Sequence, residues 1–141
     1  MSDRAHSYLI KTHVRDPSAT RFEFTAQKTM YGGKNIAAGD EIFIFDSENE
    51  GGSGLVARGV VTAVRAVPLK RGLARQTPRV SIEVRRTRLA SRRIGRDELK
   101  SYRDWKDGKP QSELNFKFYR QATNKIGGIS DAAARFLQEF L

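Results

Sequence analysis

The feature that most constrains the fold is a strictly alternating stretch at residues 79–89. Its apolar and polar side chains separate onto opposite sides of an extended chain, with Val80, Ile82 and Val84 on one side and Arg79, Ser81, Glu83 and Arg85 on the other. Successive side chains of a β-strand point to opposite faces, so this period of two indicates a strand with one buried and one exposed face. Such strands are typical of antiparallel sheets.

Other segments add strands in the first two thirds of the chain and helices near its end. We expect strands at residues 7–14, 41–46 and 55–67, the last with a bulge at Gly59, and a short helix or turn at residues 20–30. Helices are expected at residues 97–105 and 131–140, the second capped by Ser130. The sequence therefore predicts a single α+β, mainly β, domain spanning residues 1–141, built as a small mixed β-barrel with short peripheral helices.

Composition excludes several classes of protein. The 141 residues contain no cysteine and two histidines, which excludes a disulfide scaffold, a thiolate zinc site and a cysteine nucleophile. We therefore expect no metal site and no cofactor. No apolar run approaches the length of about 18 residues that spans a bilayer, and residues 1–4 lack the apolar core of a secretory signal. A soluble cytoplasmic protein with no membrane partner is expected.

Positive charge is concentrated in one third of the chain. The formal net charge is +10, and residues 58–96 contain twelve basic residues against a single acidic one, Glu83. Eleven of the twelve are arginines, whose planar guanidinium binds phosphate in a bidentate manner and stacks on bases. The pattern favours nucleic acid, RNA or DNA, over a generally basic surface. The arginines expected to contact it are Arg58, Arg75, Arg79, Arg85, Arg86, Arg88, Arg92 and Arg93.

No constellation of catalytic residues is found. Gly32-Gly33-Lys34 lacks the spacing of a nucleoside triphosphate loop, and neither histidine has a distant partner. The aromatic residues are more informative, because a base stacks on an aromatic ring with about 1–3 kcal/mol of stabilisation. Candidates for such stacking are Tyr31, Tyr102, Trp105, Phe116, Phe118 and Tyr119, although filling the core is the more common role of any single ring.

Three segments together resemble a known family. Residues 8–12, Tyr-Leu-Ile-Lys-Thr, are similar to the opening strand of EVE domains, which reads Y-W-L-F-K-S-E-P. Residues 39–47 resemble the family's G-D-x(4)-[FY]-x-S strand, and residues 59–64 resemble its following strand with a G-V/I-x-x-V ending. The resemblance covers roughly residues 7–67 and identifies the chain as similar to the PUA-like superfamily, which also includes YTH and ASCH domains.

This resemblance implies a small barrel with a pocket that accepts an unpaired or modified base. The matching wall positions are Lys11, Thr12, Asn35 and Ser47, with an aromatic side chain from Tyr31, Trp105 or Phe118. A base held in this way regains the cost of unstacking through new stacking and edge hydrogen bonds.

The expected function is recognition of nucleic acid, without catalysis by the domain itself. Two alternatives remain open. The first is an ASCH-like nuclease or small hydrolase, for which the candidates are Lys11, Tyr31, Lys34 and Glu48. The second is a protein-interaction module whose arginines bind an acidic partner.

Overall fold

The structure is a computed structural model, and it describes residues 7–73, 76–121 and 123–141. Six strands form the larger part of it: β1 (Ser7–Thr12), β2 (Arg21–Met30), β3 (Glu41–Asp46), β4 (Gly54–Ala66), β5 (Arg79–Leu89) and β6 (Lys125–Ile129). The helices are all short: η1 (Gly33–Asn35), η2 (Glu48–Glu50), α1 (Arg96–Leu99), α2 (Pro110–Leu114), the π-helix η3 (Asn115–Tyr119) and α3 (Asp131–Gln138).

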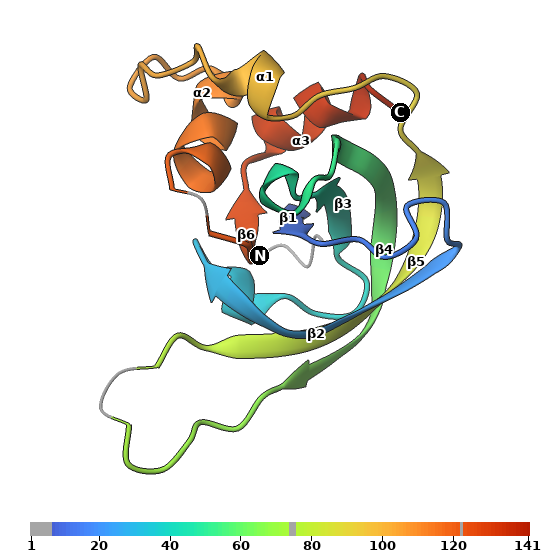
Figure 1. The fold of residues 1–141 in the computed structure, drawn as a ribbon, viewed down its shortest axis with the longest axis vertical. Helices are drawn as coiled ribbons and strands as arrows, with labels where there is room; N and C mark the ends of the chain where they lie inside the picture. Colours follow the sequence, from blue (N-terminus) through green and yellow to red (C-terminus); the bar gives the residue numbers. More distant parts are fainter. Residues whose placement is uncertain (1–6, 74–75, 122) are drawn as a thin grey trace, which may run out of the picture.

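The strands close into a barrel in the order β1-β3-β4-β5-β2-β6, with β6 returning to β1 (Figure 1). Pairing is parallel between β1 and β3 and between β2 and β6, and antiparallel elsewhere. This confirms the mainly β mixed barrel with peripheral helices that the sequence predicts.

The apolar side chains of β5 are buried, as its alternating pattern predicts. Val80, Ile82 and Val84 are buried inside the barrel, where they meet Phe22 and Phe24 of the neighbouring strand β2. The register of β4 shifts beside Gly59, which confirms the predicted bulge. A Cβ at Gly59 would lie 2.4 Å from Cγ1 of Val84, so only glycine fits this close approach of β4 to β5.

β1 and β3 are buried on both faces. Ile42 and Ile44 point into the barrel, whereas Phe43 and Phe45 point outward into a second apolar cluster. That cluster is completed by the helices, which gather over this side of the barrel, and it includes Leu99, Leu114, Phe118, Ala133 and Leu137 (Figure 1). Burial on both faces explains why residues 42–45 are apolar without alternation.

The last helix begins where the sequence predicts. The Ser130 hydroxyl accepts a hydrogen bond from the backbone N–H of Ala133 at 3.1 Å and donates to the Glu113 carboxylate of α2. The helix runs to Gln138, two residues short of the expected end, and its buried side chains are Ala133, Ala134 and Leu137. This cap therefore joins α3 to α2.

Two predicted elements are wrong. Residues 20–30 form the ten-residue strand β2 rather than a helix or turn, because Phe22 and Phe24 alternate into the core. A bulge at Ala26, which has a φ of 52°, interrupts that alternation and hides it in the sequence. The helix expected at residues 97–105 is a single turn, α1, of which only Leu99 is buried. Among the described residues, no helix has the length and apolar content needed to cross a bilayer.

Candidate functional site

Two lysines lie side by side beneath the helices. Lys11, near the end of β1, pairs in register with Lys125 at the start of β6. Alternation along both strands directs these side chains outward from the barrel, on the same side as Leu9 and Ile129, which pack against the helices. Each lysine is only 2% exposed. A buried charge is costly unless it is paired or hydrogen-bonded, so the partners of each ammonium decide what this site can do.

Lys11 is satisfied by the protein itself. Its Nζ donates a hydrogen bond of 2.7 Å to the carbonyl oxygen of Phe118, in the last turn of η3. Carbonyls at a helix C-terminus lack a partner within the helix and carry partial negative charge, so a cation is favourable there. The same Nζ lies 4.7 Å from the ring centre of Tyr119. Burial lowers the pKa of Lys11, and the charge of Glu48 opposes that change.

Lys125 is far less satisfied. Its Nζ makes one long hydrogen bond, 3.3 Å to the carbonyl oxygen of Thr123, and lies 5.2 Å and 5.9 Å from the ring centres of Phe118 and Tyr31. Within the described ranges it forms no ion pair with a carboxylate. Burial, followed by repulsion from Lys11 and Arg120, lowers the pKa of Lys125 to about 8. This ammonium therefore retains donor capacity for a ligand.

Glu48 is the nearby acid, and it is already engaged. The hydroxyl of Tyr119 donates to its carboxylate at 3.1 Å, and the backbone N–H of Arg96 donates to it at 2.6 Å. Burial and the charge of Glu48 raise the pKa of Tyr119, so the phenol stays protonated. Glu48 therefore connects η2 to α1 and η3.

A row of aromatic rings leads from this site to the surface. Tyr31 contacts Phe116 at a centroid distance of 6.2 Å, and Phe116 meets Trp105 edge-on at 5.3 Å. The Arg120 guanidinium lies 4.3 Å from the ring centre of Phe116 and 5.6 Å from that of Trp105. Trp105 is 43% exposed, and its indole N–H donates to Asn115 Oδ1 at 2.8 Å. Flat, fixed rings beside a guanidinium are suitable for stacking a base.

The pocket residues expected from the resemblance fall into several places. Lys11 and Phe118 contact each other, and Tyr31 reaches Trp105 through Phe116. The carbonyl of Thr12 accepts from the backbone N–H of Ser47 at 2.8 Å, so these two lie together. The set as a whole stays a prediction.

Two surface hollows flank the lysines. Tyr31 and Asn35 line one of about 420 Å³ together with Tyr8 and Lys117. A second, of about 370 Å³, is lined in part by Lys28, Arg79, Thr123 and Asn124. Ser47 is fully buried behind it and donates to Asn124 Oδ1 at 2.8 Å. Asn35 therefore lines one hollow, whereas Ser47 lines neither of the two and contacts Asn124 at the edge of the other.

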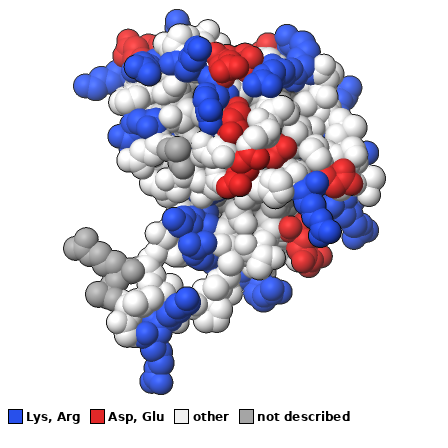
Figure 2. Space-filling model, viewed as in Figure 1, with Lys and Arg blue, Asp and Glu red and all other residues white. Residues whose placement is uncertain are grey.

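The predicted arginine surface is divided. Five of its arginines are held by the protein: Arg58 by Glu41, Arg79 by the Ala26 carbonyl, Arg86 by the Ser18 carbonyl, Arg92 by the Glu139 carbonyl, and Arg93 by Asp97 and Glu98. Alternation along β5 directs Arg85 to the face opposite Arg86 and Arg88. Arg75 lies outside the described residues. Lys and Arg occupy several sides of the molecule, with Asp and Glu between them (Figure 2).

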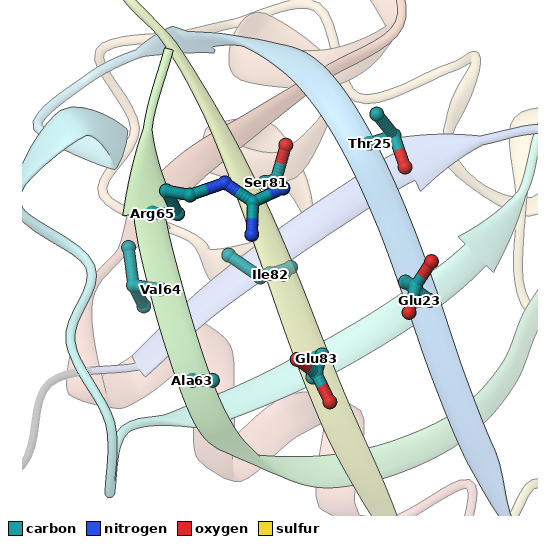
Figure 3. Close-up of a pocket in the computed structure, with 8 residues that line it drawn as sticks. All are labelled: Glu23, Thr25, Ala63, Val64, Arg65, Ser81, Ile82 and Glu83. Atoms are coloured by element: carbon teal, nitrogen blue, oxygen red, sulfur yellow. The ribbon is translucent and has the colours of Figure 1, made fainter.

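A third hollow, of about 340 Å³, lies on the exposed side of β2, β5 and β4 (Figure 3). Glu23 and Glu83 face each other there across adjacent strands, with Arg65 beside Ser81. Two neighbouring carboxylates repel a phosphate backbone, so this hollow is the one least suited to a polyanion.

Several residues of the site were missed by sequence reasoning, namely Lys125, Arg120, Lys117 and Asn124. Lys125 stands 114 positions after Lys11, and only the register of β1 with β6 brings the two together. The one sequence signal was a lysine leading the short apolar strand Lys-Ile-Gly-Gly-Ile, which by itself does not show burial.

The comparisons with known proteins concern the fold. No protein-family model matches the chain, and no curated protein matches it by sequence. Solved structures do match over nearly the whole chain. The DUF55 domain of human thymocyte nuclear protein 1 is 15% identical, covers 94% of this chain and 96% of its own, and superposes with a TM-score of 0.64.

Two further structures extend the comparison. Human THYN1 protein in complex with DNA containing 5-methylcytosine is 18% identical over 96% of both chains, with a TM-score of 0.65. A hypothetical protein from Leishmania major is 14% identical, with 99% of this chain and 96% of its own covered and a TM-score of 0.60. At these identities the likeness, together with the closed six-stranded barrel, shows that this chain shares the fold of these proteins, a small barrel of the kind that the sequence resemblance implies.

Proposed function

We propose that the chain binds nucleic acid and holds an unpaired or modified base at the lysine–aromatic site, defined as Lys11, Lys125, Tyr31, Phe118 and Tyr119. The observation that carries this proposal is the buried ammonium of Lys125, which has aromatic rings and further cations around it and no carboxylate paired with it in the described chain. Such a site favours a ligand rich in hydrogen-bond acceptors or negative charge.

The chemistry of a nucleotide suits this arrangement. Keto oxygens and ring nitrogens of a base accept hydrogen bonds from an ammonium, and the faces of the base stack on aromatic rings. Phe116 and Trp105 supply the outer rings, and the exposed Arg120 is placed to contact the phosphates next to the bound base. Unpaired or weakly paired bases cost least to extract, so they are the preferred ligands.

The human THYN1 structure supports the same class of ligand, since that protein was solved with DNA containing 5-methylcytosine. At 18% identity the likeness concerns the fold, and the lysine–aromatic site is the independent support in this chain.

Fluorescence-anisotropy titration of short single- and double-stranded RNA and DNA tests the proposal. Matched oligonucleotides carry a single cytosine, 5-methylcytosine or unpaired base at the centre. We expect Lys125→Met to reduce affinity at least tenfold, while Lys100→Met, at an exposed lysine beside α1, leaves it unchanged. Failure of the wild-type chain to bind any oligonucleotide at low salt, or equal affinity of the Lys125 variant, refutes the proposal.

A further inference from the structure

The hairpin between β4 and β5 extends beyond the barrel. β4 pairs with β3 only from Gly54 to Val60, whereas its pairing with β5 continues to Ala66. The hairpin therefore projects from the barrel toward the lower left of Figure 1. We call residues 65–73 and 76–79 the arm. Its length exceeds what closing the barrel requires, so it needs an explanation of its own.

Hydrogen bonds join the two sides of the arm near its tip. The side chain of Gln76 spans it, accepting from the backbone N–H of Lys70 at 2.7 Å and donating to the carbonyl oxygens of Lys70 at 2.6 Å and Leu73 at 3.3 Å. Gly72, with a φ of 81°, makes the turn between these points. Gln76 thus satisfies the backbone of Lys70, while the side chains of Leu69, Lys70, Arg71 and Leu73 are exposed.

Two leucines at this tip are unusually exposed. Leu69 is 66% exposed and Leu73 57%, the highest fractions among the large apolar side chains of the described chain. Apolar area left in water is unfavourable, and large apolar side chains exposed on a projecting segment commonly mark a contact site. Nothing in the described part of the chain covers them.

The charge on the arm identifies the chemistry of its partner. Arg65, Lys70, Arg71 and Arg79 are basic, and no acidic residue occurs from Arg65 to Arg79. Lys and Arg side chains lie on the projecting arm in Figure 2. A partner must therefore be anionic and also offer apolar surface. Duplex nucleic acid does both, because a two-stranded ribbon fits the major groove and leucines can wedge between base steps.

The base of the arm lies near the proposed site. Arg79 lines the hollow that contains Thr123 and Asn124, and these residues directly precede Lys125. A duplex lying along the arm would thus present its bases near the lysine–aromatic site.

We propose that the arm enters a groove of duplex nucleic acid, with Lys70 and Arg71 on phosphates and Leu69 and Leu73 against a base step. The leucines loosen the stack, so that a base can leave the duplex for the lysine–aromatic site. This inference rests on the proposed function, and it adds a preference for duplex and a device for unstacking.

The test compares a duplex carrying one central mismatch with its separate single strand. The variant Leu69→Ser with Leu73→Ser loses at least tenfold in affinity for the duplex and keeps its affinity for the single strand. The variant Lys70→Gln with Arg71→Gln lowers the log–log salt slope for the duplex by about two, since each phosphate contact contributes about 0.9. Lys106→Gln with Lys109→Gln, at exposed positions between α1 and α2, is the charge-matched control and keeps the wild-type slope.

A second readout follows the base directly. With 2-aminopurine next to the mismatch, fluorescence rises when the wild-type chain binds and fails to rise with the leucine variant. Wild-type affinity of the leucine variant for the duplex overturns the inference, and so does binding of the wild-type chain to single strands alone. In both cases Lys125→Met still weakens binding, so the proposed function survives. The leucine variant is also tested on anionic phospholipid vesicles. If it binds the vesicles less tightly than the wild-type chain but binds the duplex equally well, the arm belongs to a membrane contact and the inference is overturned.

Discussion

Lys125 is the residue at which stability and ligand binding conflict. Its ammonium is buried with a single long hydrogen bond, next to the positively charged Lys11 and Arg120. Such a group destabilises the ligand-free fold, because burial removes hydration that the protein only partly replaces. An acceptor-rich ligand restores those interactions. We therefore expect Lys125→Met to stabilise the protein while it weakens nucleic-acid binding.

The contribution of Lys125 to the free energy of unfolding changes with pH in a definite direction. The native pKa of Lys125 is about 8 and its ordinary value is 10.5. Between these values the unfolded chain binds the proton and the native chain does not, so the free energy of unfolding rises with pH. From pH 7.5 to 9.0 the gain amounts to about 1 kcal/mol. The advantage of Lys125→Met in urea denaturation should shrink by that amount over the same interval.

Other titrating groups do not obscure this result. The lowered pKa of Lys11 acts in the same direction but is present in both proteins. The raised pKa values of Tyr8 and Tyr119 act in the opposite direction only above about pH 10. The difference in free energy of unfolding between Lys100→Met and the wild-type chain should not change over this pH interval. If the difference in free energy of unfolding between Lys125→Met and the wild-type chain stays constant from pH 7.5 to 9.0, the lowered pKa of Lys125 is contradicted.

At the scale of elements, η1 depends on one close contact with β6. A Cβ at Gly33 would lie 2.3 Å from the carbonyl oxygen of Ile126, a backbone atom that cannot move aside without disturbing the strand. Gly33→Ala should lower the free energy of unfolding by about 1–3 kcal/mol. It should also weaken nucleic-acid binding, because η1 begins only two residues after Tyr31. Thermal denaturation and anisotropy measure the two effects, and Lys34→Ala in the same turn should leave both unchanged.

β2 and β5 carry an unfavourable arrangement of charge. Arg21 lies directly opposite Arg85, and Glu23 directly opposite Glu83. Like charges in directly opposed positions destabilise a sheet, and opposite charges stabilise it by roughly 0.2–1 kcal/mol per pair. The exchange Arg21→Glu with Glu23→Arg turns both pairs into opposite charges at constant composition. The melting temperature should rise at low salt, and the gain should shrink in 1 M NaCl. An unchanged melting temperature at low salt would show that these side chains do not interact.

The elements also show what a sequence can and cannot reveal. β5 was predictable because Val80, Ile82 and Val84 keep a strict period, and β3 because both of its faces are buried. β2 was not, since the bulge at Ala26 breaks its period after two phenylalanines. The residues of the site also differ in whether the sequence could reveal them. Lys11 lies within a recognisable strand motif, whereas Lys125 becomes informative only through a strand register that no local pattern encodes.

For the whole molecule, the barrel and the helices are expected to unfold together. The outward side chains of β1 and β3, among them Leu9, Phe43 and Phe45, are buried only because the helices cover them. The helices in turn depend on the barrel, because α1, α2 and α3 each contain only four to eight residues, too few to be stable alone. Without the helices the barrel keeps its interior cluster but exposes this second one, and the helices have no apolar core of their own.

This dependence predicts a single unfolding transition. Trp105, the only tryptophan, contacts η3 and reports on the helices, whereas far-UV circular dichroism reports mainly on the strands. Leu137→Ala, at a fully buried position in α3, should lower the free energy of unfolding by about 2–5 kcal/mol and shift both signals by the same amount. Arg135→Ala, exposed on the same helix, should shift neither. If tryptophan fluorescence changed at lower denaturant than circular dichroism, the helices would be a separate unit, and the lysine–aromatic site between the two layers could open without unfolding of the barrel.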